Sequence, residues 1–223
     1  MKILAVDAAT EACSAALLLD CVLTERFEVI GRGHAARLLP MADELLREAG
    51  LAPRDLDAVA FGRGPGGFTG LRIAAGIAQG LAAGAGRPVV PVSNLAAVAA
   101  GAARAHGRPH VVACMDARMG QVYWAAFDCS GARPRALTPE HLSVPGAVKL
   151  PDLPPMFGAG HGFAAYPELA VRLAGAISGV DHRALPRAAD VARIGAVDLA
   201  SGGGLAPAQG VPVYLRDEVV HRR

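Results

Sequence analysis

The sequence predicts an α/β protein built from two related halves. A strand, an Asp-Ala turn and a second strand occupy residues 2–19, and the same unit recurs at residues 110–127. Such a repeat of one supersecondary unit indicates a duplicated fold. Strand-like and helical segments alternate between the two units, which is typical of sheets flanked by helices. With 52% hydrophobic and 19% charged residues, the 223-residue chain can bury a substantial core.

The elements of the first half follow from hydrophobic periodicity. Alternating apolar, β-prone residues predict strands, and apolar residues every three or four positions predict helices. In order, we expect strands at 2–7, 13–19 and 23–30, a helix at 34–49, a strand at 56–61, a helix at 68–84, a strand at 88–92 and a helix at 94–105. We therefore place the first half at residues 1–105.

The second half, residues 106–223, carries weaker signals. Strands are expected at 110–116 and 121–127, followed by a Pro-rich stretch at 134–155 and a turn with glycines at 158, 160 and 162. A helix at 188–200 is ended by three consecutive glycines. We expect the tail, residues 205–223, to pack back on the first half. Its basic residues, Arg216, His221, Arg222 and Arg223, are interpreted as a solvated chain end.

The loop at residues 61–72 is similar to two nucleotide-binding fingerprints and completes neither. Gly62, Gly64 and Gly67 have dinucleotide-site spacing, yet no Asp or Glu follows until Asp116 to bind a ribose. In the Walker A alignment, Phe68 stands where a Lys must reach the phosphates. Hydride transfer and P-loop chemistry are both excluded.

We expect this glycine loop to be a structural turn first and an anion site second. Pro65 fixes its own φ, while Gly64, Gly66 and Gly67 permit positive φ, so the loop can turn tightly into the following helix. Thr69 would then cap that helix or contact an anion.

Charge and cysteine content limit the partners and the compartment. A net charge of +2 is too small for an autonomous nucleic-acid binder. An acid inside the first apolar run prevents a signal-peptide core, and Ala-rich runs are interrupted before a membrane span develops. We expect a cytoplasmic protein with no membrane contact. Its cysteines should be buried and reduced: Cys13, Cys21, Cys114 and Cys129.

Two helices are predicted to form a partner interface. The helix at 34–49 has an apolar band wider than one sheet face requires, formed by one stripe of Leu38, Met41 and Leu45 and a second of Leu39, Ala42, Leu46 and Ala49. The helix at 68–84 places Gly76, Gly80 and Gly84 beside Ile73, Ile77 and Leu81. Each interior glycine costs about 1 kcal/mol relative to Ala, which a close helix approach would offset. Burial of both helices inside their own domain remains the alternative.

The element order resembles that of the actin-like ATPase (ASKHA) superfamily, in which two carboxylates flank a nucleotide cleft. Specific segments are similar to the bacterial TsaB family, formerly YeaZ: residues 6–10, 33–34 with 38–40, 62–73, 115–120 with 122–123, and 212–216. The resemblance covers essentially the whole chain. It departs at Gln121, where the family hairpin is expected to carry Glu.

The resemblance implies a non-catalytic paralogue that pairs with the homologous enzyme TsaD. That partner transfers a threonylcarbamoyl group to the adenosine beside the anticodon of tRNA, and the ATPase TsaE joins the assembly. By this resemblance, the chain binds tRNA only as part of the complex, and the isolated chain is a homodimer. It has no intrinsic cofactor, although a nucleotide could lie at the partner interface.

The residues themselves indicate no catalytic or metal site. The catalytic paralogue holds a metal on two His one helical turn apart, and here Leu38 follows His34 at that spacing. His106 and His110 have Gly107 and Pro109 between them, which excludes a shared helix face. Asp7 and Asp116 are interpreted as turn caps, or as vestigial phosphate-site carboxylates.

Two other functions remain open at this point. A small-molecule kinase or ATPase of the same fold would need a third acid near a phosphate loop and a full second domain. A stand-alone tRNA binder is disfavoured by the near-neutral charge.

Overall fold

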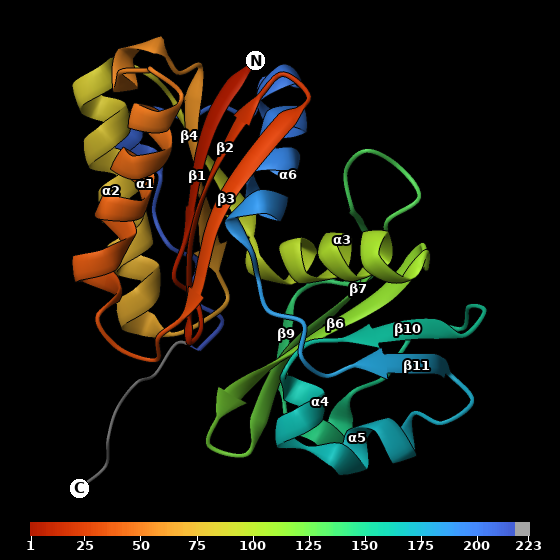
Figure 1. Cartoon of the computed structure of the whole chain (residues 1–223). Helices are drawn as coiled ribbons and strands as arrows, with labels where there is room; N and C mark the ends of the chain where they lie inside the picture. Colours follow the sequence, from red (N-terminus) through yellow and green to blue (C-terminus); the bar gives the residue numbers. More distant parts are fainter. Residues whose placement is uncertain (217–223) are drawn as a thin grey trace, which may run out of the picture.

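The computed structural model describes residues 1–216 as two lobes, each built on a mixed β-sheet (Figure 1). The first sheet has the order β3-β2-β1-β4-β5. Its strands are β1 (Lys2–Asp7), β2 (Ala12–Leu19), β3 (Val22–Val29), β4 (Ala58–Gly64) and β5 (Val89–Ser93). β1, β2 and β3 are antiparallel, while β4 and β5 run parallel to β1.

The second sheet repeats this arrangement. Its order is β11-β10-β6-β7-β8, with β9 also paired to β7. Its strands are β6 (His110–Arg118), β7 (Gln121–Asp128), β8 (Arg135–Ala136), β9 (His141–Ser143), β10 (Met156–Ala159) and β11 (Ile177–Asp181). In each lobe the first two strands form a hairpin, and the next two main strands are added in parallel to the first strand. The duplication expected from the sequence is confirmed.

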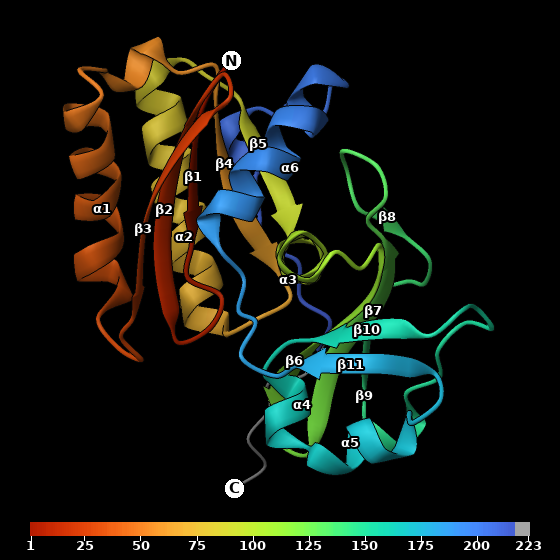
Figure 2. The same cartoon turned by 45° about the vertical axis from the view of Figure 1, so that its right-hand side comes forward.

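Helices cover both faces of the first sheet (Figure 1). α1 (His34–Glu48) and α2 (Phe68–Ala85) lie on one face, and α6 (Ala188–Ala200) lies on the other. α3 (Asn94–His106) packs between the lobes against β6 (Figure 2). The second lobe carries two short helices, α4 (Gly162–Ala165) and α5 (Pro167–Arg172). Three 3-10 turns complete the order: Pro53–Asp55, Pro145–Ala147 and Pro207–Gln209.

Successive side chains of β1 point to opposite faces of the first sheet, which explains why the sheet needs helices on both sides. Leu4 and Val6 pack into the core under α1 and α2, whereas Ile3 and Ala5 pack into the core shared by α3 and α6. Both sets of side chains are fully buried. The expected division at 105/106 follows the chain but not the packing, because α6 from the second half completes the first lobe.

The N-terminus of α6 is fastened to the first sheet. The Ser14 hydroxyl accepts the backbone N–H of Ala188 at 2.9 Å, and the Glu25 carboxylate accepts that of Ala189 at 3.0 Å. Glu25 also pairs with Arg187. Side chains from β2 and β3 thus satisfy helix N–H groups that would otherwise lack acceptors.

The tail also returns to the first lobe. Leu205 bridges to Val89, and Gln79 of α2 donates to the Gly210 carbonyl at 3.1 Å. Farther along, the Val213 N–H donates to the Arg63 carbonyl at 2.7 Å. The structure describes the tail only to residue 216, so His221, Arg222 and Arg223 lie outside the described residues. Within residues 1–216, no helix has the length and apolar character needed to cross a membrane.

The cysteine prediction is confirmed in part. All four thiols are free, and Cys13 and Cys114 are buried. Cys21 is exposed, because it occupies the turn between β2 and β3 rather than a strand interior.

Candidate functional site

A cleft of about 740 Å³ separates the two lobes. It is lined by six segments: the β1–β2 turn, the start of α1, the glycine loop with the start of α2, the β6–β7 hairpin, His161 before α4, and the tail at residues 213–216. In a duplicated α/β fold of this kind, ligands bind where the ends of the strands meet.

Asp7 does not face this cleft. Its side chain is fully buried, one carboxylate oxygen accepts the Ala9 N–H at 3.1 Å, and the other accepts the Asn94 amide. A Cβ at Gly62 would overlap the carboxylate, so the β4 backbone packs directly against the Asp7 side chain. Burial raises the pKa of Asp7 to about 6. The carboxylate is turned into the interior, so the residues present do not fit a metal-bound nucleotide there.

Asp116 occupies the equivalent position in the second lobe and does line the cleft. Its carboxylate accepts the Arg118 N–H at 2.8 Å and the Tyr166 hydroxyl at 3.2 Å. Both repeated acids therefore accept the N–H two residues ahead, which confirms them as turn caps. A role as vestigial phosphate-site carboxylates stays a prediction for both acids, although the enclosed Asp7 carboxylate no longer reaches the cleft.

The glycine loop is a turn that packs closely on the β1–β2 turn. Gly64 has φ of 117°, and the bond to Pro65 is cis. Gly67 donates its N–H to the Ala9 carbonyl at 2.7 Å, and a Cβ at Gly66 would lie 2.6 Å from the same oxygen. Of the three loop glycines, only Gly64 needs a positive φ. Gly66 is required because the loop backbone lies too close to the Ala9 carbonyl to leave room for a side chain.

Thr69 does not cap α2, contrary to one of its two expected roles. The capping position is Gly67, and no side chain provides a capping hydrogen bond. Thr69 lies one residue beyond the first helical position and faces the cleft. Its contact with an anion stays a prediction.

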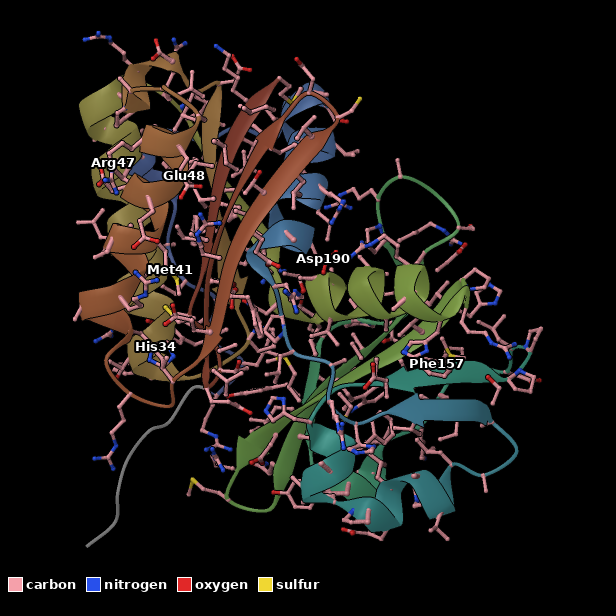
Figure 3. The ribbon with its side chains drawn as sticks, in the orientation of Figure 1. His34, Met41, Arg47, Glu48, Phe157 and Asp190 are labelled. Atoms are coloured by element: carbon pink, nitrogen blue, oxygen red, sulfur yellow. The ribbon has the colours of Figure 1, made fainter. Side chains whose placement is uncertain are left out.

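Two histidines line the cleft from opposite lobes. His34 is the first residue of α1 (Figure 3), and His161 precedes α4. His34 Nε2 and His161 Nδ1 are buried without a hydrogen-bond partner among residues 1–216. Burial lowers the pKa of His161. Within the same residues, no three His, Cys, Asp or Glu side chains are grouped closely enough to hold a metal ion.

The prediction for α1 as a partner surface is wrong at three residues. Leu38, Met41 and Leu45 are buried, with Leu45 only 1% exposed, and they pack into the core between α1, α2 and the sheet. The second stripe packs there as well, since Ala42 and Leu46 are also buried. Only Leu39 stands out, at 47% exposure. α1 uses its wide band to contact both the sheet and α2.

The α2 residues remain available for a partner. Gly76, Gly80 and Gly84 are exposed, and a Cβ added at any of them meets no atom within 4 Å. Ile73 and Ile77 are half-buried beside them. No contact within residues 1–216 therefore offsets the helix cost of these glycines.

Two residues that tie the site together carried no clear sequence signal. Asn94 links Asp7 to the glycine loop by accepting the Gly64 N–H at 2.7 Å. Arg216 reaches from the tail to the β6–β7 hairpin and donates to Gln121 Oε1 at 2.6 Å. A polar residue at the start of a helix and an Arg near a chain end are too common to single out without coordinates.

Comparison with known proteins agrees with this architecture. Residues 27–217 match the family model of TsaD, tRNA N6-adenosine threonylcarbamoyltransferase. The chain is 40% identical to the tRNA threonylcarbamoyladenosine biosynthesis protein TsaB of Escherichia coli, over 100% of this chain and 98% of that protein. The Haemophilus influenzae TsaB is 39% identical over 100% of this chain and 97% of its own length.

Solved structures show the same relationship. YeaZ from Pseudomonas aeruginosa superposes with a TM-score of 0.88 at 42% identity, covering 96% of this chain and 99% of that chain. A second structure, described as an uncharacterized protein with similarity to peptidase YEAZ from Pseudomonas aeruginosa, gives 0.90 at 44% identity with the same coverage. The duplicated sheets, the shared cleft and these relatives establish that the chain has the actin-like ASKHA fold and belongs to the TsaB (YeaZ) family.

Proposed function

We propose that this chain is a non-catalytic subunit for the biosynthesis of threonylcarbamoyladenosine in tRNA, and that it acts by binding a TsaD-like catalytic homologue. Its full-length relatives are named for this biosynthesis. The observation that carries the non-catalytic assignment is the burial of Asp7, which leaves the end of β1 without a carboxylate facing the cleft.

The outer face of α2 supports the partner assignment. Gly76 and Gly80 lie inside α2 and cost it about 2 kcal/mol relative to alanines, while Gly84 is next to its last residue. Since nothing in residues 1–216 packs on Gly76, Gly80 or Gly84, a second protein can approach the helix backbone closely there. Half-buried Ile73, Ile77 and Leu81 flank this line and would pack against the partner's helices.

The same face serves self-association in this proposal. The isolated chain forms a homodimer through α2 with the exposed rim of α1, including Leu39, and the catalytic homologue replaces the second copy. A TsaE-like ATPase joins the heterocomplex, tRNA is bound by the complex rather than by this chain alone, and any nucleotide lies at the partner interface. The assembly works in the cytoplasm, where it meets tRNA.

The test is co-expression with the TsaD-like homologue, followed by size-exclusion chromatography and an assay of threonylcarbamoyladenosine formation. The wild-type chain should co-elute with the homologue and be required for modification, and the homodimer should disappear on mixing. Gly80→Leu should abolish both complexes while the monomer stays folded, because the side chain extends into the approach path.

Two outcomes would contradict the proposal. One is steady ATP turnover by the purified chain alone that is lost in Asp7→Asn, which would favour a kinase or ATPase. The other is a ternary species that contains the homologue and still retains the homodimer contact, which would place the two partners on separate surfaces.

A further inference from the structure

A second hollow of about 350 Å³ lies away from the cleft, between α3, α6 and the loop that joins β7 to β8. Figure 2 shows this loop rising beside α6. We call this hollow the arginine groove, because three arginines line it: Arg104 in the last turn of α3, Arg108 just after that helix, and Arg193 on α6. The other residues that line it have mostly small side chains and are mainly Ala, Gly and Pro.

Charge in the arginine groove is unbalanced. Arg104 Nη1 lies 2.7 Å from Asp190 Oδ1, and Arg193 Nη1 lies 3.8 Å from the same oxygen. Arg108 has no acidic partner within residues 1–216. Three guanidinium groups and one carboxylate therefore line the groove, and this excess of positive charge attracts anions.

Asp190 is buried beneath the arginines rather than exposed beside them. It is 1% exposed and lies where α6 meets α3 (Figure 3). A Cβ at Gly101 would lie 2.8 Å from its Oδ2, so that glycine makes room for the carboxylate. Asp190 thus forms an ion pair with Arg104 and lies near Arg193, and both arginines are half-exposed, so their outer N–H donors stay open to solvent. A guanidinium that is already ion-paired loses less freedom on binding an anion than an unpaired one.

The loop across the groove is fixed as well. Arg133 pairs with Asp198 of α6, and Arg135 pairs with Asp128 at the end of β7. The first pair ties the loop to α6, and the second joins β8 to β7 at the base of the loop. Neither pair adds net charge beside the arginine groove.

The lining indicates the chemical class of the ligand. Guanidinium groups match the paired oxygens of a phosphodiester, and no aromatic side chain lines the groove for base stacking. None of the large exposed hydrophobic residues lines it either, so a peptide would find no apolar anchor. These features favour an RNA backbone over an acidic protein segment.

We propose that the arginine groove binds the phosphodiester backbone of the tRNA held by the assembled complex. This rests on the proposed function, which brings tRNA to the complex. α6, which forms one wall of the groove, lies on the face of the first sheet opposite α1 and α2 (Figure 1), so a partner that covers α2 leaves the groove open. It contacts phosphates without reading sequence.

The experiment measures tRNA binding by the complex of this chain with the catalytic homologue. Arg108→Gln is the first variant, since removing it orphans no buried acid. Arg104→Gln and Arg193→Gln are then added to it. The matched control is Arg54→Gln, an exposed arginine on the 3-10 turn before β4. Dissociation constants for a tRNA transcript are recorded over a series of salt concentrations.

Each lost phosphate contact should lower the slope of log K against log salt by about one, and the triple variant should bind tRNA at least about tenfold more weakly. Arg54→Gln should match wild type. If Arg108→Gln and the triple variant both bind tRNA as Arg54→Gln does, the proposal is overturned. It is also overturned if tRNA binding is unchanged while a protein component dissociates, because the groove then binds an acidic protein segment.

The wild-type complex separates this result from a failure of the proposed function. A wild-type chain that neither binds the homologue nor supports modification refutes the proposed function. A wild-type complex that forms and modifies tRNA, with groove variants that bind tRNA normally, refutes the arginine groove alone. Thermal unfolding of each variant confirms that the chains compared are folded.

Discussion

Asn94, the first residue of α3, donates its side-chain amide to the Asp7 carboxylate, and both side chains are completely buried. The Asn94 carbonyl oxygen accepts the Gly64 N–H, so the amide orientation is fixed from both ends. One hydrogen-bonded pair thereby joins the end of β1, the glycine loop and the start of α3.

Exchanging these two residues should restore a network that either single change breaks. Asp7→Asn alone presents one N–H₂ group to another and should lower the free energy of unfolding by about 2–3 kcal/mol. Combined with Asn94→Asp, the amide at position 7 can donate to the carboxylate at position 94, which still accepts from Gly64. Urea unfolding of the four proteins of this cycle measures the effect. Equal destabilisation of the single and exchanged proteins would contradict it.

The stability of the wild type relative to Asp7→Asn should depend on pH. The folded-state pKa of Asp7 is about 6, above the unfolded value near 3.9, so the native state binds the proton more tightly. Between about pH 4 and 6, the free energy of unfolding should therefore fall as pH rises, by up to about 3 kcal/mol, and then level off. Urea unfolding at several pH values checks this. A difference that rises with pH over this range would show that Asp7 is stabilised in its ionised form.

Two substitutions at Gly80 should separate protomer stability from partner binding. Gly80→Ala adds a Cβ into open space and should raise the free energy of unfolding by up to about 1 kcal/mol. Gly80→Leu should also leave the monomer folded but should block a close helix approach. Unfolding curves of both variants measure monomer stability, and size-exclusion chromatography measures partner binding. A loss of monomer stability in Gly80→Ala would mean that the glycine is required within the chain itself.

Leu39 and Leu45 form a matched pair on α1. Leu45→Ala should cost about 2–4 kcal/mol, because its side chain is fully enclosed. Leu39→Ala should change monomer stability by less than about 0.5 kcal/mol, since that side chain is largely exposed. By the same reasoning, Leu45→Glu should unfold the chain instead of only dissociating a dimer. If the two alanine variants lowered the free energy of unfolding by similar amounts, α1 would have to face the sheet with a different side than the structure shows.

Arg216 and Gln121 offer a test of the tail. Gln121→Glu should replace a neutral hydrogen bond to Arg216 with an ion pair, and protect the tail by about 0.5–1 kcal/mol at low salt. Arg216→Ala should release the tail from the hairpin. Amide hydrogen exchange of residues 205–216 reports both effects. Unchanged exchange in Arg216→Ala would mean that the contacts of the tail with the first lobe hold it without Arg216.

The strongly periodic parts of the fold could be predicted from sequence. The strands of the first sheet, the helices α1, α2 and α3 and the ends of α6 follow from residue patterns, and their bounds agree within three residues. The strands β8 to β11 and the helices α4 and α5 have only two to six residues each, too few to show a period. Their pairing with longer strands, not local propensity, creates them.

The roles of the site residues were harder to predict, because the burial of a side chain depends on residues that are close in space but distant in sequence. The apolar stripe of Leu38, Met41 and Leu45 has the same pattern whether a sheet or a partner covers it. Asp7 could be assigned as a turn cap from its place after a strand, but its enclosure depends on Gly62 and Asn94, which are distant in sequence. Contacts of this range leave no local signal.

The position of α6 on the first sheet has a consequence for synthesis of the chain. When α3 has left the ribosome, the face of the sheet that carries Ile3, Ala5 and Ala60 still lacks its helix. Residues 188–200 follow only after the whole second lobe. At about 5–20 residues per second, this delay lasts on the order of ten seconds. During that time an apolar sheet face is open to solvent and to chaperones, and a fragment that ends after α3 would keep it open permanently.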